Sequence, residues 1–146
     1  MKKTMIVLLT LSCFPTFAQS DVTKQKVIEA CTNYLDGFYK GDTLKIIQSL
    51  SPTMHKFGFW KNKETGLYEN DGFMTFEAAL DYSRQVLNSN RFIPESAPKK
   101  VEVLDIGQSI ASAKVTAWWG IDYLLLSRQS NDNWLIEQVL WEGPNN

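Results

Sequence analysis

The chain contains few of the residues on which catalytic and metal sites usually depend. Its 146 residues include one histidine, His55, and two cysteines, Cys13 and Cys31. A zinc cluster or a Cys–His nucleophile pair is therefore not indicated. A GxGxxG motif and a Walker loop are also missing, which argues against a nucleotide site of standard type. We expect neither a metal nor a cofactor.

Basic clusters and long apolar runs are scarce as well. The 15 Lys and Arg residues face 16 acidic ones, which gives a formal net charge of −1. Binding to nucleic acid needs concentrated Lys and Arg, so a nucleic-acid partner is not expected. The apolar runs fall short of the roughly 20 residues of a membrane span, so we expect no span.

The N-terminus reads as a secretory signal peptide over residues 1–18. Lys2 and Lys3 form a basic start, an apolar stretch follows over residues 5–11, and Thr16-Phe17-Ala18 is a small-x-small cleavage site. We expect cleavage after Ala18, export to the periplasm or beyond, and one mature domain over residues 19–146.

A lipoprotein signal with Cys13 as the lipidated residue is the alternative, and Leu11 stands one position too late for a good lipobox. Cleavage leaves Cys31 alone, so the mature chain cannot form an intramolecular disulfide.

Apolar residues at spacings of three and four predict three helices in the N-terminal half. The first extends from Asp21 to Gly41, with an apolar face of Val27, Ile28, Cys31, Tyr34, Leu35 and Phe38. Asp42 caps a shorter second helix that Ser51-Pro52 stops. Thr75 caps a third helix that reaches about Ser89.

Short β patterns fill the rest of the chain. Segments 56–61 and 66–69 predict a hairpin, followed by a turn at residues 70–72. Four more strands are expected at residues 101–106, 110–119, 123–128 and 134–141. Gly120 marks a bulge or a sharp bend, and in an alternating strand Trp118 and Trp119 point to opposite faces. We therefore expect an α+β cone, in which a strongly curved, mainly antiparallel sheet of about six strands wraps the helices.

The order of elements, together with four segments, resembles the NTF2-like superfamily, whose members form cystatin-like cones. More narrowly, it is similar to the secreted bacterial form of the branch called "putative lumazine-binding". The segments are residues 34–42 (YLDGFYKGD), 50–66 (LSPTMHKFGFWKNKETG), 113–128 (AKVTAWWGIDYLLLSR) and 134–144 (WLIEQVLWEGP). The branch often has a His–Pro pair after the second helix, where this chain has Ser51-Pro52. The superfamily includes isomerases, dehydratases, cyclases and binding or adaptor proteins, so the resemblance implies a fold and leaves the activity open.

His55 is the natural candidate for acid–base chemistry, because enzymes on this scaffold place such groups inside an apolar cone. Asp122 and Glu137 are its candidate partners, since both interrupt apolar strands and a buried charge needs pairing. The alternative is that His55 lies at a surface turn or makes a structural hydrogen bond.

Aromatic side chains from several strands form a second constellation: Trp60, Trp118, Trp119, Tyr123, Trp134 and Trp141. Such rings fill a core without any ligand, and they also suit a planar one. Tyr34 lies on the apolar face of the first helix, where its hydroxyl either bonds to backbone or contacts a ligand.

Three functions remain open. The first is an exported domain that binds a small apolar or aromatic molecule in a pocket lined by Tyr34, His55, Trp60, Trp118, Asp122 and Glu137. The second is an isomerase or dehydratase with His55 as general base and Asp122 orienting it. The third is a dimerisation or adaptor module, because the outer face of such a sheet often pairs with a second copy.

Overall fold

The computed structural model describes residues 16–144. The predicted signal peptide over residues 1–18, and the alternative that Cys13 is lipidated, lie outside the described residues apart from the start of the first helix. Along the chain the elements are α1 (Thr16–Lys40), α2 (Thr43–Ser49), β1 (Leu50–Lys61), β2 (Tyr68–Met74), α3 (Phe76–Asn88), β3 (Lys100–Ile106), β4 (Ile110–Ala117), β5 (Gly120–Arg128) and β6 (Trp134–Glu142). Within residues 16–144, no helix is both long and apolar enough to cross a membrane.

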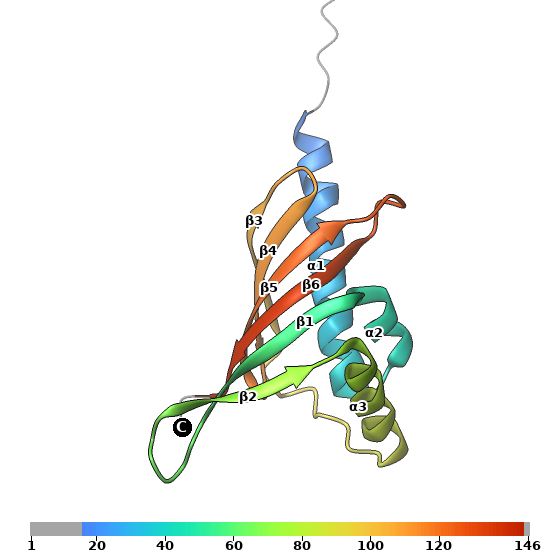
Figure 1. Cartoon of the computed structure of the whole chain (residues 1–146). Coiled ribbons are helices and arrows are strands. Elements are labelled where there is room, and N and C mark those ends of the chain that lie inside the picture. Colours follow the sequence, from blue (N-terminus) through green and yellow to red (C-terminus); the bar gives the residue numbers. More distant parts are fainter. Residues whose placement is uncertain (1–15, 145–146) are drawn as a thin grey trace, which may run out of the picture.

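The six strands form one curved sheet in the order β2-β1-β6-β5-β4-β3. The β1–β6 pair is parallel and the other four pairs are antiparallel. The long helix α1 lies along the inner face of the sheet (Figure 1). Helices α2 and α3 lie near the C-terminal end of α1, on the side of the sheet formed by β1 and β2. The predicted α+β cone, with its three helices and mainly antiparallel sheet, is confirmed.

The core lies between α1 and the inner face of the sheet. Sequence positions spaced by three and four on α1 are buried there: Val27, Cys31, Tyr34, Leu35 and Phe38. They pack against alternate strand residues, among them Ala113, Val115, Leu124, Leu126, Ile136 and Val139. Each fully buried Val or Leu stabilises the fold by about 1.5–3 kcal/mol relative to an exposed one. Burial also raises the pKa of the Cys31 thiol to about 12.

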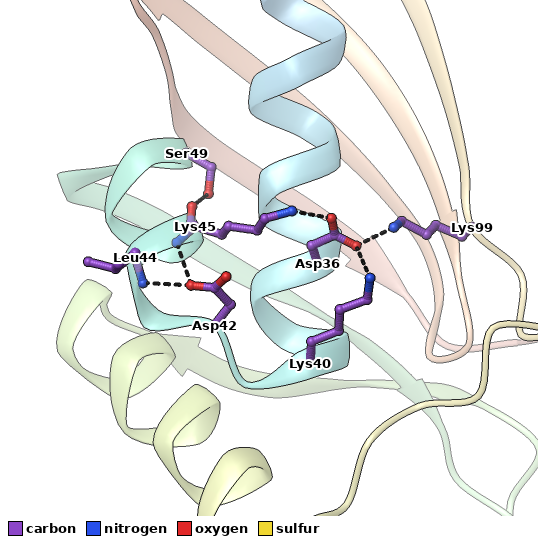
Figure 2. A network of polar contacts seen from close by, with 7 residues as sticks. All are labelled: Asp36, Lys40, Asp42, Leu44, Lys45, Ser49 and Lys99. Carbon is purple, nitrogen blue, oxygen red and sulfur yellow. Dashed lines mark hydrogen bonds and ion pairs between the residues drawn. The ribbon is translucent and has the colours of Figure 1, made fainter.

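The ends of the helices follow the sequence signals. Gly41 adopts φ +68° at the end of α1, a conformation that favours glycine. The carboxylate of Asp42 accepts hydrogen bonds from the backbone N–H groups of Leu44 and Lys45 at the start of α2 (Figure 2). Thr75 caps α3 by accepting from the N–H of Ala78 at 3.2 Å. These three predicted helix ends are confirmed, whereas the predicted start of the first helix at Asp21 is wrong, because α1 already begins at Thr16.

A buried carboxylate, that of Asp36 on α1, holds three segments together. It accepts hydrogen bonds from Lys45 on α2 and from Lys99 before β3, and Lys40 lies 3.9 Å away (Figure 2). Burial raises the pKa of Asp36, but the two lysine hydrogen bonds outweigh it, so this pKa lies below its ordinary value. The network fixes the C-terminal end of α1 against α2 and the entry to β3.

Two strand boundaries differ from the predictions. Strand β1 begins at Leu50, because Leu50 pairs with Ile136 of β6; the register then shifts, and pairing resumes at His55. The turn expected at residues 70–72 lies within β2 instead. There the register shifts, so that Asp71 and Gly72 together oppose Gly58, and Gly72 has φ +81°. Turn composition therefore marked a bulge in a continuous strand.

The expectation for the two adjacent tryptophans was also wrong. Ala117 pairs with Gly120, so Trp118 and Trp119 are the two residues of a tight turn between β4 and β5. Gly120, at φ +133°, begins β5 and marks the sharp bend that was one of its two predicted roles. Because turn residues do not alternate between faces, both indole rings are free to point to the same side.

Candidate ligand pocket

A pocket of about 190 Å³ opens where the C-terminal half of α1 meets the sheet. Five elements and the β4–β5 turn supply its wall, which consists of Phe38, Lys56, Met74, Tyr82, Trp118, Trp119 and Trp141. Among the described residues that line it, Lys56 alone carries a charge. The pocket is therefore a mostly aromatic cavity with one amine in its wall.

The tight β4–β5 turn brings Trp118 and Trp119 to this pocket. The hydroxyl of Tyr39 accepts a hydrogen bond from the backbone N–H of Trp118 at 2.9 Å and donates one to the carbonyl of Pro98. Gly120 allows the turn to approach β6 closely, since a Cβ atom there would lie 2.0 Å from the carbonyl oxygen of Glu142. The ring of Trp119 then packs edge-on against Phe38 at 5.8 Å between centroids.

Strand alternation places Lys56 inside the cone. Met54, Lys56 and Gly58 share the buried face of β1. The Nζ atom of Lys56 lies 5.3–5.8 Å from the ring centroids of Tyr34, Phe38, Trp119 and Trp141. Cation–π attraction from four rings partly replaces the hydration that the ammonium loses.

The carboxylate of Asp122 supplies the countercharge. Its Oδ2 atom accepts hydrogen bonds from the hydroxyl of Tyr34 and, at 3.2 Å, from Lys56. Its Oδ1 atom accepts from the indole N–H of Trp119 at 2.6 Å. Lys56 also donates to the Tyr34 hydroxyl oxygen at 2.6 Å. A buried carboxylate with three donors has its desolvation cost offset.

Burial and the charge of Asp122 shift the pKa values of Tyr34 and Lys56. Burial, followed by the negative charge of Asp122, raises the pKa of Tyr34 well above its ordinary value. Burial lowers the pKa of Lys56, and the neighbouring carboxylate only partly opposes this. Tyr34 therefore stays a neutral donor. The charges of Lys56 and Asp122 cancel, which leaves the site with no net charge.

Three of the residues proposed from the sequence come together here. Trp118 lines the pocket with 43% of its surface exposed. Tyr34 and Asp122 do not line it: both are fully buried behind its wall, where they bind Lys56, and Asp122 also binds Trp119. The other three, His55, Trp60 and Glu137, lie elsewhere.

His55 is exposed on the outward face of β1, with its ring 6.1 Å from that of Phe73. The structure therefore does not bring His55 together with Asp122. Alternation is the physical reason, because an immediate sequence neighbour of the inward-facing Lys56 must face outward. The arrangement of a histidine base oriented by Asp122 is absent from the described residues.

Trp60 is 40% exposed and packs against Trp141, with ring centroids 6.0 Å apart, outside the pocket. Glu137 lies where the β5–β6 register shifts and accepts a hydrogen bond from the hydroxyl of Ser127. Neither residue lines the aromatic pocket. The described residues also contain no group of three or more His, Cys, Asp or Glu side chains that would hold a metal ion.

Sequence reasoning missed Lys56. A signal was present, because Lys56 is in phase with Met54 and Gly58 in a strand-like segment, while His55, Phe57 and Phe59 share the other phase. A lysine in a strand is normally assigned to solvent, and the paired acid, Asp122, lies on a distant segment. His55 was proposed because an imidazole titrates near neutrality, and its phase in the strand was not considered.

The curved sheet wrapped on a long helix, with a pocket between the helix and the sheet, is the arrangement of an NTF2-like fold. Residues 22–142 match the model of the family described as "Putative lumazine-binding", and the chain belongs to that family. A comparison with curated proteins found no match.

Solved structures show the same fold. An NTF2-like protein of unknown function from Shewanella baltica OS155 is 14% identical, with a TM-score of 0.62, over 90% of this chain and 98% of that one. An NTF2-like protein of unknown function from Methylobacillus flagellatus KT is 15% identical, with a TM-score of 0.60, over 86% and 93% of the two chains. A protein of unknown function with a cystatin-like fold from Nostoc punctiforme PCC 73102 is 11% identical, with a TM-score of 0.57, over 84% and 92%.

Proposed function

We propose that this protein is an exported binding domain for a flat, uncharged, ring-containing small molecule. The observation that carries the proposal is the aromatic pocket whose one amine is already neutralised by Asp122. An anionic ligand would have to compete with that carboxylate for Lys56. A neutral ligand with a carbonyl oxygen leaves the ion pair intact and accepts a hydrogen bond from the ammonium.

The size of the pocket limits the ligand. A dry cavity of roughly 150 Å³ holds one benzene molecule. The volume of about 190 Å³ therefore suits one substituted ring, and a second ring would extend toward the exposed face of Trp118. Rings of this kind stack on or meet the edges of Trp118, Trp119 and Phe38.

The family description points to the same chemistry. Lumazine is a flat bicyclic heteroaromatic molecule with ring carbonyls, which is the kind of ligand that the pocket walls and the Lys56 ammonium favour. We take it as a probe of the class rather than as the natural ligand.

The N-terminal sequence supports export, and we propose removal of residues 1–18. Mass spectrometry of protein recovered from the periplasm should then find Gln19 at the N-terminus. An acylated Cys13 at the N-terminus would instead establish the lipoprotein alternative. Native mass spectrometry of the same sample should detect a bound small molecule, which names the ligand directly.

Binding is tested by titrating lumazine, and a one-ring neutral carbonyl compound, into the purified protein while recording tryptophan fluorescence. We expect saturable quenching in the wild type and at least a tenfold loss of affinity in Trp118→Ala, or about 1.4 kcal/mol. Trp60→Ala is the matched control, because Trp60 is exposed to nearly the same fraction, 40% against 43%, but lies outside the pocket. Equal effects of the two substitutions would contradict the proposal.

We also propose that the outer face of the sheet pairs with a second copy of the chain. Register places Phe73, Phe57, Leu140 and Tyr123 side by side across β2, β1, β6 and β5. Phe73, Leu140 and Tyr123 are exposed, which makes a continuous apolar row. Next to Tyr123, the same row continues with Lys114 on β4 and Glu102 on β3. In a symmetric dimer each copy would therefore offer both a cation and an anion to the other copy.

Sedimentation velocity on Tyr123→Lys, Leu140→Lys and the double variant tests this pairing. We expect a wild-type dimer and monomeric variants, with ligand quenching retained because the pocket lies on the opposite face. Leu44→Lys, an exposed substitution on α2, is the control and should leave the dimer unchanged. A wild type that sediments as a monomer at all accessible concentrations contradicts the pairing.

A further inference from the structure

The amine of Lys56 is placed as a nucleophile for a bound carbonyl group. It lines the pocket itself and is enclosed by the rings of Tyr34, Phe38, Trp119 and Trp141. A ligand that fills the pocket must therefore lie beside Nζ. Lysine amines that react with carbonyl compounds are typically desolvated in apolar sites of this kind.

Two groups beside Nζ are placed to take a proton from the Lys56 ammonium. The Tyr34 hydroxyl oxygen lies 2.6 Å from Nζ and Asp122 Oδ2 lies 3.2 Å from it, while Tyr34 donates its own proton to Asp122. Moving one proton from Lys56 to Asp122, directly or through the Tyr34 hydroxyl, converts an ion pair into two neutral groups. The proton count of the buried site stays the same, so no uncompensated charge appears.

We propose, on the basis of the binding function given above, that Lys56 captures one-ring aromatic aldehydes as an imine. The free electron pair of Nζ attacks the carbonyl carbon, and the carbonyl electron pair moves to oxygen. The oxygen takes up two protons, the one held by Asp122 and a second one released by the attacking nitrogen, and leaves as water while a C=N bond forms. One ammonium and one aldehyde thus give one protonated imine and one water, with no oxidant or reductant. The cationic imine then pairs with the Asp122 carboxylate.

The pocket also favours persistence of the imine. An aromatic aldehyde places its ring among Phe38, Trp118, Trp119 and Tyr82 when its carbonyl carbon meets Nζ. These rings limit the access of water, the reagent that hydrolyses imines. A pocket of about 190 Å³ accepts one ring with a short substituent, so benzaldehyde is a suitable probe.

The test uses the intact protein with benzaldehyde and sodium cyanoborohydride at neutral pH, which converts an imine into a stable benzylamine. Peptide mapping by mass spectrometry then locates the benzyl group. We expect Lys56 to be labelled at least about tenfold faster than the exposed Lys63 and Lys100, because the pocket holds the aldehyde beside Nζ of Lys56 and not beside the other two amines. Benzyl alcohol, which fits the pocket but cannot form an imine, should slow the labelling of Lys56 alone.

The unfolded protein provides the internal control, because in denaturing urea all lysines are solvated and the preference for Lys56 should disappear. Labelling of the folded protein that is spread evenly over exposed lysines would overturn the imine proposal. Tryptophan quenching by benzyl alcohol separates the two proposals. Quenching without a label on Lys56 overturns imine formation and leaves the binding function standing, whereas no quenching and no label overturns both.

Discussion

The ammonium of Lys56 lies 3.2 Å from the Oδ2 atom of Asp122, and the two side chains are only 8% and 0% exposed. They come from β1 and β5, and β6 lies between these strands in the sheet. The pair thus spans the inner face of the sheet beneath α1. Tyr34 on α1 contacts both partners and joins the helix to them.

Removing the charge of Asp122 should destabilise the fold strongly. Asp122→Asn leaves the Lys56 ammonium buried without a countercharge, and we expect a loss of about 3–5 kcal/mol in the free energy of unfolding. Urea denaturation at pH 7 measures it. The matched control is Asp81→Asn, which removes an exposed partner of Arg84 and should cost at most about 1 kcal/mol. A loss no larger than the control's would show that the pair contributes little.

Stability should depend on pH through Asp36. Its pKa is lower in the folded chain than in the unfolded chain, so its stabilising contribution is present above the unfolded pKa near 3.9 and is lost as pH falls through the folded pKa. Asp36→Asn should cost about 1–3 kcal/mol at pH 6. It should also flatten the acid limb of the plot of unfolding free energy against pH, measured with urea. An unchanged acid limb would show that Asp36 does not carry this dependence.

The turn that presents Trp118 and Trp119 should tolerate no side chain at Gly120. Gly120→Ala combines a positive φ with a Cβ atom 2.0 Å from the Glu142 carbonyl oxygen. Gly66→Ala is the matched control, because Gly66 also has a positive φ, +72°, but a Cβ atom there would meet nothing within 4 Å. The control should cost about 1–2 kcal/mol and Gly120→Ala at least about 1–3 kcal/mol more, measured by thermal or urea unfolding. Equal losses would exclude the close approach.

The Cys31 thiol should be inert in the folded protein. Burial raises its pKa to about 12, so almost no thiolate exists at neutral pH and the sulfur is closed to reagents. Iodoacetamide should label Cys31 only as fast as the chain unfolds, and urea should restore rapid labelling. Peptide mapping locates the label on Cys31. Fast labelling under native conditions would mean that α1 separates readily from the sheet.

Much of the fold was predictable from the residues because its signals are local. The spacing of apolar residues gave three helices, and Gly41, Asp42 and Thr75 marked their ends correctly. The turn near Trp118 was missed, because the alternation over residues 110–117 continues smoothly into two large apolar residues. The turn signal, Gly120, comes only after them.

The candidate site was only partly predictable. Tyr34 and Asp122 were recognised, since a polar group in an apolar segment indicates a buried partner, and Trp118 was recognised as one of several aromatic residues on the strands. His55 was chosen over its neighbour Lys56, and the phase of a single strand decided between them. A shift of one residue exchanges the inner and outer faces.

The amino-acid sequence by itself determined the order of helices and strands, the caps and the buried face of α1, because these depend on interactions between near neighbours in the chain. Tertiary structure alone decided that a lysine in the wall of an aromatic pocket meets a carboxylate and a tyrosine hydroxyl behind that wall. The desolvation cost of burying Lys56 is offset only when Asp122 and Tyr34, which lie 66 and 22 residues away along the chain, are in place to bind it. No local pattern records that pairing.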